Sequence, residues 1–393
     1  MPDLSARVLE LVATGQAASR TEIAALLGAA PSTVSHVVGQ LLAHGLLAEE
    51  GTDVSTGGRP RKVLRIGGVD EYAVAADVGG GHARIGIVLP GGALESVANV
   101  PFALSDGPTA GLQRLAALLE RLADDRGRVG LRGVGLSLPG PVDVEAGVVD
   151  LPSRMPGWNG FPVAAWLTER FGLPAVVDND ANCMAAGEQT VQDPARRQTI
   201  TIKAGSAIGA GSSSTDGCTA GRPGRPGHHA RAHRRGRDTP CSCGNTGCLE
   251  TVASGAALVR ILSAAGVDVS STADVVRLAS DAHPEATRAV RLAGRYLGEV
   301  LAANVNFFNP DAVYLGGILS TLDPFIAAVR SQLYESCHPL MTQHLAIEPV
   351  SLGADAGLVG AGQFALQRGL AASLEALSAP IPQSTTRNRS VRV

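Results

Sequence analysis

Short apolar runs that end in glycines or carboxylates recur along most of this chain, and they constrain its fold more than any other feature. Such runs cover residues 73–77, 133–138, 175–177, 200–202 and 313–315. Helical patterns lie between most of them, and apolar strands that alternate with helices indicate an α/β fold. In such folds ligands bind at the carboxyl ends of the strands, which is where these glycines and carboxylates stand.

The first 65 residues follow a different pattern, with three short amphipathic helices. Ser19 and Glu22 are spaced as a capping box, and the helix that they begin is predicted to end at Gly28. A third helix follows the turn at Pro31 and has an apolar face of valines and leucines. Its other face carries short polar side chains: Ser32, Thr33, Ser35, His36 and Gln40. This combination is typical of a DNA recognition helix, because polar side chains can approach base edges while the apolar face anchors the helix.

Residues 46–48 and 63–66 can pair as two strands around a glycine-containing loop, which would complete a winged helix-turn-helix. The loop carries Arg59, Arg61 and Lys62, which suit contacts with the DNA backbone or the minor groove. The 393-residue chain has a formal net charge of −3, which excludes coating of nucleic acid through bulk positive charge. The local basic loop still predicts a DNA contact. A generic three-helix bundle with a basic loop is the alternative.

Three of the strand ends lead into turns that could hold phosphates, since glycines let backbone amides approach an anion closely. Each turn alone is a weak signal, because a tight strand–helix turn needs glycine with or without a nucleotide. The candidate phosphate-binding residues are Asp77, Gly79, Gly80, Gly205, Ser206, Gly316 and Gly317.

Three of the six cysteines, Cys241, Cys243 and Cys248, fall within eight residues. No apolar run approaches the ~20 residues needed to span a bilayer, and the first ten residues lack a basic stretch followed by an apolar one. We therefore expect the cytoplasm, where crowded cysteines indicate a metal site more than disulfides.

Together these features resemble the ROK family (repressor, open reading frame, kinase), whose actin-like ATPase fold places two lobes around a cleft. The resemblance covers residues 5–370 and is most specific at residues 241–250, which fit the family signature CxCGxxGCxE. It implies that the three cysteines and one upstream histidine form a structural zinc site. His228 is the first choice for the histidine, with His229 and His233 as alternatives.

The resemblance also implies a division of the chain and the residues of its cleft. The expected parts are a DNA-binding head at 1–68, a first lobe at 69–185, a second lobe with the zinc motif at 186–370, and a disordered tail at 371–393. The implied sugar-binding residues are Asn179, Asp180, Glu250 and His228. In the kinases of the family the aspartate, here Asp180, is the general base on the sugar hydroxyl, and the glycine turns hold ATP. The simpler alternative is that Asn179 and Asp180 only cap the following helix.

Several departures from the family pattern argue against a kinase. Arg225 stands where the family has a sugar-binding glutamate, Gly81 replaces a threonine of the first phosphate turn, and Ala207 replaces a glycine of the second. Lys203 occupies a buried strand position. Residues 212–237 contain no large apolar side chain, so this stretch is either a divergent loop or the product of two compensating frame shifts, which resequencing of the gene would decide.

Two functions follow from these observations. The first is a transcriptional repressor that binds operator DNA as a homodimer or homotetramer and responds to a sugar or sugar phosphate in the cleft. The alternative is an ATP- and magnesium-dependent sugar kinase that retains a head domain, with Asp180 as its base.

Overall fold

The computed structural model of the chain describes residues 4–13, 15–43, 46–50, 63–66, 71–214, 217–218 and 239–378. The predicted wing residues Arg59, Arg61 and Lys62 lie outside this set, and so do the three candidate zinc histidines. Among the described residues, no helix is both long and apolar enough to cross a membrane.

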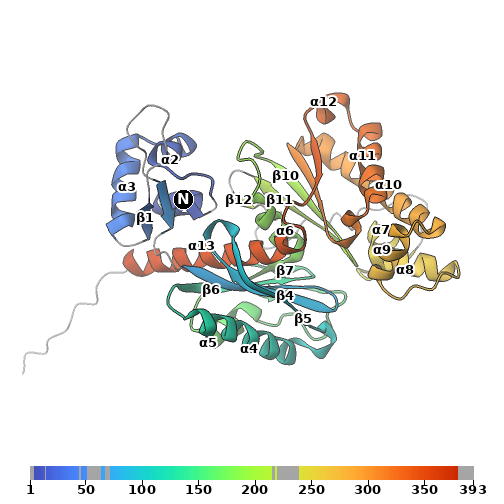
Figure 1. The fold of residues 1–393 in the computed structure, drawn as a ribbon, viewed down its shortest axis with the longest axis horizontal. Coiled ribbons are helices and arrows are strands. Elements are labelled where there is room, and N and C mark those ends of the chain that lie inside the picture. Colours follow the sequence, from blue (N-terminus) through green and yellow to red (C-terminus); the bar gives the residue numbers. More distant parts are fainter. Residues whose placement is uncertain are drawn as a thin grey trace, which may run out of the picture.

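The N-terminal head consists of three helices and a two-stranded sheet (Figure 1). The elements are α1 (Leu4–Ala13), α2 (Arg20–Leu27), α3 (Pro31–Ala43), β1 (Leu47–Glu50) and β2 (Val63–Ile66). Ser19 caps α2 and accepts a hydrogen bond from the Glu22 amide at 3.3 Å, and Gly28 ends the helix with a left-handed φ of 59°. The Glu22 carboxylate accepts from the Ala18 amide, one residue before the position that the capping box predicts. The predicted strands pair antiparallel, with Leu47 opposite Ile66.

The first lobe is built on a five-stranded sheet of order β5-β4-β3-β6-β9. Its strands are β3 (Tyr72–Val78), β4 (His82–Val88), β5 (Leu94–Pro101), β6 (Leu131–Leu138) and β9 (Ala175–Asn179). Helices α4 (Pro108–Arg126) and α5 (Val163–Phe171) pack on one face, where Leu115, Leu119 and Leu167 are buried. A small hairpin, β7 (Val142–Asp143) and β8 (Val148–Val149), follows β6. The strands β3, β6 and β9 run parallel, so their carboxyl ends meet at one edge.

The second lobe repeats this plan with a sheet of order β12-β11-β10-β13-β14. Its strands are β10 (Thr199–Ala204), β11 (Ile208–Ser214), β12 (Gly217–Cys218), β13 (Ala312–Gly316) and β14 (Ala346–Pro349). The helices among its described residues include α7 (Glu250–Ala253), α8 (Gly255–Ala264), α9 (Thr272–Ser280), α10 (Pro284–Phe308), α11 (Asp323–Ser336) and α12 (Pro339–Thr342). Side chains of α10 and α11 form one buried core with the sheet.

Helices α6 (Asp180–Gln189) and α13 (Ala356–Ser378) lie between the two sheets and cross each other closely. A Cβ atom on Gly360 would lie 1.8 Å from the carbonyl oxygen of Cys183. A Cβ atom on Gly187 would lie 2.0 Å from the carbonyl oxygen of Ala356. Only glycines allow this approach. Figure 1 shows α13 running from this crossing to the head, where Leu370 joins the head core. The helix continues to Ser378, further than the predicted start of the tail, and residues 379–393 are not described.

Candidate functional site

The polar face of α3 is exposed as the recognition-helix prediction requires. Val34, Val37 and Val38 are buried in the head core, with exposed fractions of 8% or less. The five predicted DNA-contacting residues, Ser32, Thr33, Ser35, His36 and Gln40, are all exposed. Their contacts with DNA stay a prediction, as do those of the basic wing.

At the carboxyl ends of the first-lobe strands, where the family resemblance implies the cleft, Asp77, Ser137 and Asp178 lie side by side on β3, β6 and β9. The Ser137 hydroxyl donates a hydrogen bond to Asp77 Oδ1. On the other side of Asp77 lies the first turn of α13, since a Cβ on Gly357 would be 2.5 Å from Asp77 Oδ2. Both oxygens of this predicted phosphate-turn carboxylate therefore contact the protein itself.

The amide of Asn179 is used within the fold. Asn179 caps α6, with Oδ1 accepting from the Ala181 amide at 2.9 Å and Nδ2 donating to the Gly140 carbonyl at 2.7 Å. Capping is thus present for Asn179, and sugar binding by Asn179 stays a prediction that capping does not exclude.

Asp178, which the sequence analysis did not single out, positions this turn. Its Oδ1 accepts a hydrogen bond from the backbone N–H of Asn179 at 2.6 Å and another from the side-chain Nδ2 of Asn182 at 2.9 Å. Burial raises the pKa of Asp178 to about 6, and these two hydrogen bonds oppose the rise. The signal in the sequence was its place beside the Asn-Asp pair at a strand end.

Of the other predicted sugar-binding residues, His228 lies outside the described residues, and Asp180 and Glu250 each form an ion pair. Asp180 Oδ2 lies 2.8 Å from Lys203 Nζ, and Glu250 Oε1 lies 2.9 Å from Arg154 Nη2. Glu250 Oε2 also accepts from the Ile208 amide at 2.8 Å. Burial raises the pKa of Glu250, while the Ile208 amide and the Arg154 charge act against it. Neither Lys203 nor Arg154 was predicted as a site residue.

The glycine turns of the second lobe have structural reasons of their own. A Cβ on Gly316 would lie 2.4 Å from Met184 Sδ, and Gly317 has a φ of 82° with the Ala204 carbonyl oxygen 2.5 Å from its would-be Cβ. The Gly205 carbonyl accepts from the Gly255 amide at 2.7 Å. These contacts account for Gly316 and Gly317 without a nucleotide, whereas a Cβ on Gly205 would meet only the Ala207 carbonyl oxygen, at 3.9 Å. Phosphate binding at these turns stays a prediction.

The three cysteines come together as predicted. The sulfur atoms of Cys241, Cys243 and Cys248 all lie within 4.8 Å of one another, and those of Cys243 and Cys248 are 3.7 Å apart. Two sulfurs at about 2.3 Å from a tetrahedral zinc ion are about 3.8 Å apart, so the cluster fits zinc. Burial and the two neighbouring sulfurs raise the pKa of Cys248 to about 12, because three thiolates repel one another without a cation. The cluster lies immediately before Glu250 and would fix the start of α7.

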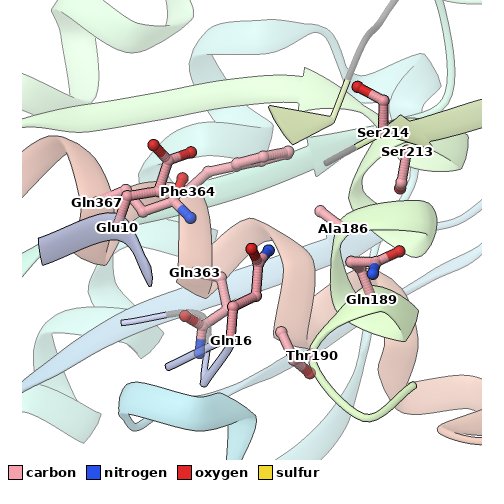
Figure 2. Close-up of a pocket in the computed structure, with 10 residues that line it drawn as sticks. All are labelled: Glu10, Gln16, Ala186, Gln189, Thr190, Ser213, Ser214, Gln363, Phe364 and Gln367. Carbon is pink, nitrogen blue, oxygen red and sulfur yellow. The ribbon is translucent and has the colours of Figure 1, made fainter. Parts of the chain in front are cut away.

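A hollow lies between the head and the body (Figure 2). It has a volume of about 60 Å³, and its lining includes Gln16 of the head, Gln189 of α6, and Gln363 and Phe364 of α13. Among the described residues, the buried Oε1 atoms of Gln189 and Gln363 have no hydrogen-bond partner. This junction is therefore polar and incompletely packed, and it costs less to rearrange than a close-packed core.

Comparison with known proteins agrees with both parts of the fold. The model of the ROK family matches residues 73–368, and that of the IclR helix-turn-helix domain matches residues 5–51. The chain belongs to the ROK family and carries a helix-turn-helix head.

Particular relatives divide between regulators and kinases. The xylose repressor of Caldicellulosiruptor bescii is 26% identical, over 90% of this chain and 92% of its own. The glucokinase of Halalkalibacterium halodurans is 28% identical, over 76% of this chain and 96% of its own. The crystal structure of a ROK family transcriptional regulator, a homologue of the E. coli MLC protein, superposes with a TM-score of 0.74. It covers 94% of this chain and 97% of its own at 24% identity, which supports the fold.

Proposed function

We propose that this chain is a DNA-binding transcriptional regulator of sugar metabolism, a repressor, controlled by a sugar or sugar phosphate in the cleft. It binds its operator in the cytoplasm as a homodimer or homotetramer, since a helix-turn-helix reads paired half-sites through two copies. The similarity to the xylose repressor over 90% of this chain, together with the helix-turn-helix match at residues 5–51, supports this function.

One observation carries the link between ligand and DNA, namely the path of α13. This helix contacts Asp77 through Gly357 at the cleft, crosses α6 at Gly360, and places Leu370 in the head core. A ligand that moves α6 or the first turn of α13 therefore acts on the head. The polar junction lined by Gln189 and Gln363 would let the head shift without opening a packed core.

Binding to DNA upstream of the chain's own gene tests the proposal. We expect a footprint at moderate salt, and a change in affinity when xylose, glucose, N-acetylglucosamine or one of their phosphates is added. Ser35→Ala should change the base preference, whereas Ser280→Ala, which alters an exposed serine of α9, should leave binding unchanged. No protected site for the wild-type chain would contradict the proposal.

A sugar kinase is the second candidate, because Asp77, Asp180 and Glu250 gather at the cleft and some relatives are named glucokinase. The ion pairs of Asp180 and Glu250 argue against kinase activity, because these carboxylates would have to release Lys203 and Arg154 before they could act on a sugar. A coupled assay with ATP and glucose, N-acetylglucosamine, N-acetylmannosamine or fructose separates the candidates. Turnover that Asp180→Asn abolishes would favour the kinase.

A further inference from the structure

Lys203 is an unusual residue in this chain. Of 33 basic side chains only Lys62 and Lys203 are lysines, and Lys203 is the one in the two-lobed body. It lies on the central strand β10, between β11 and β13, where its neighbours Ile202 and Ala204 are fully buried. Its own side chain is 19% exposed. A charged side chain at such a position is costly unless it is paired, so its partners indicate its purpose.

The partner carboxylates belong to the first lobe, whereas Lys203 belongs to the second. Lys203 Nζ lies 2.8 Å from Asp180 Oδ2 at the start of α6. Burial lowers the pKa of Lys203, but the negative charges of Asp180 and of Asp77 on β3 outweigh burial and hold the pKa above its ordinary value. The side chain is therefore a permanent ammonium ion near these two aspartates.

A cleft that transfers phosphate from ATP needs a divalent cation among its carboxylates, to hold the phosphates and neutralise their charge. The residues here do not fit that requirement. An ammonium ion already neutralises Asp180, and it would repel a metal ion placed between Asp180 and Asp77. Asp77 is in turn engaged by the Ser137 hydroxyl and packed against Gly357 of α13.

We propose that Lys203 is a built-in cation that replaces the divalent metal between Asp77 and Asp180, so that the cleft binds its ligand without metal or nucleotide. The two aspartates then form a latent divalent-cation site that the lysine keeps closed. The inference rests on the cleft being the ligand site of the proposed regulator. The ligand class that follows is a sugar recognised without MgATP.

Manganese binding to the full-length, zinc-loaded protein tests the inference, with free Mn²⁺ measured by electron paramagnetic resonance. The wild-type chain should bind no Mn²⁺ in the cleft. Lys203→Met removes the ammonium with little change in length, and it should bind about one Mn²⁺ per chain that the wild type does not bind. The double variant Lys203→Met/Asp180→Asn should lose that gain. Lys203→Arg, which keeps the charge, should behave as the wild type.

Two results would overturn the proposal. One is a folded Lys203→Met chain, checked by circular dichroism, that gains no Mn²⁺ site. The other is a wild-type chain that binds Mn²⁺ in a manner that Asp180→Asn abolishes. If Lys203→Met does not fold, Lys203→Gln takes its place. The comparison of Mn²⁺ binding by the wild type and by Asp180→Asn requires neither lysine variant, so it tests the proposal in every case. None of these measurements involves DNA, so their failure is distinct from a failure of the proposed function.

Discussion

The polar residues of α3 and those of the cleft differ in how the fold treats them. On α3 the five candidate side chains are exposed, while the opposite face is buried against the head. In the cleft, Asp77, Asn179, Asp180 and Glu250 each have partners within the chain. The exposed face thus suits a large external partner. The cleft suits a small ligand that must exchange contacts with what is already there.

The largest expected effect comes from forcing α6 and α13 apart at Gly360, on the helix that runs from the cleft to the head. A Cβ there meets the Cys183 carbonyl oxygen at 1.8 Å, so Gly360→Ala must push α13 away from α6. We expect a loss of about 3 kcal/mol or more in the free energy of unfolding, measured by urea denaturation.

Gly39→Ala is the matched control for that change, because a Cβ on this glycine of α3 meets nothing within 4 Å. The same chemical change should raise stability there by about 1 kcal/mol, since alanine favours a helix over glycine. Equal losses at the two positions would mean that the close crossing of α6 and α13 is not what requires Gly360.

Removing the cysteine cluster should disturb the cleft and spare the head. Cys243→Ala is expected to abolish zinc binding, measured as zinc per chain after dialysis, and to lower the melting temperature by several degrees, because the metal holds the segment before Glu250. Cys337→Ala is the control, because Cys337 is a free cysteine that does not belong to the cluster. This substitution should leave the zinc content unchanged. Full zinc content in Cys243→Ala would contradict the site.

The free energy of unfolding should depend on pH through the buried carboxyl group of Asp178. The pKa of Asp178 is raised from 3.8 to about 6, so the folded chain binds this proton more tightly than the unfolded chain. The resulting stabilisation is complete below about pH 4 and is lost as the pH rises through 6. Asp178→Asn resembles the protonated acid and keeps an Oδ1 to accept from Asn179 and Asn182.

We therefore expect Asp178→Asn to match the wild type near pH 4.5 and to be more stable by about 1–2 kcal/mol at pH 7.5, measured by urea denaturation at both values. A difference that does not depend on pH would mean that Asp178 is ionised in the folded chain.

The sequence predicted the elements whose residues repeat regularly and missed those that do not. The strands that end in glycines lie where expected, whereas β5 and β14 were missed. β5 alternates apolar residues with polar or charged ones such as Glu95 and Asn99 on an edge strand, and β14 is only four residues long. Neither contains an apolar run that marks a buried strand.

For the site, sequence reasoning found the carboxylates but not the cations that pair with them. Lys203 follows Asp180 by 23 residues on another lobe, and Arg154 lies in an irregular loop, so no local pattern connects either one to its partner. Both pairings exist only because the two sheets face each other across α6 and α13. Long-range ion pairs of this kind depend on tertiary packing, which periodicity and motif spacing do not encode.

The smallest expected effect concerns the base-reading role of α3. His36→Ala should weaken binding to the operator by about 1–2 kcal/mol and relax base preference, while the dependence of affinity on salt stays the same, because a base contact releases no counterions. Fluorescence anisotropy at two salt concentrations with operator and scrambled DNA measures both quantities. A reduced salt slope would instead make His36 a phosphate contact. Equal weakening on both DNAs would likewise place specificity elsewhere on the head, and α3 would then anchor the complex without reading the sequence.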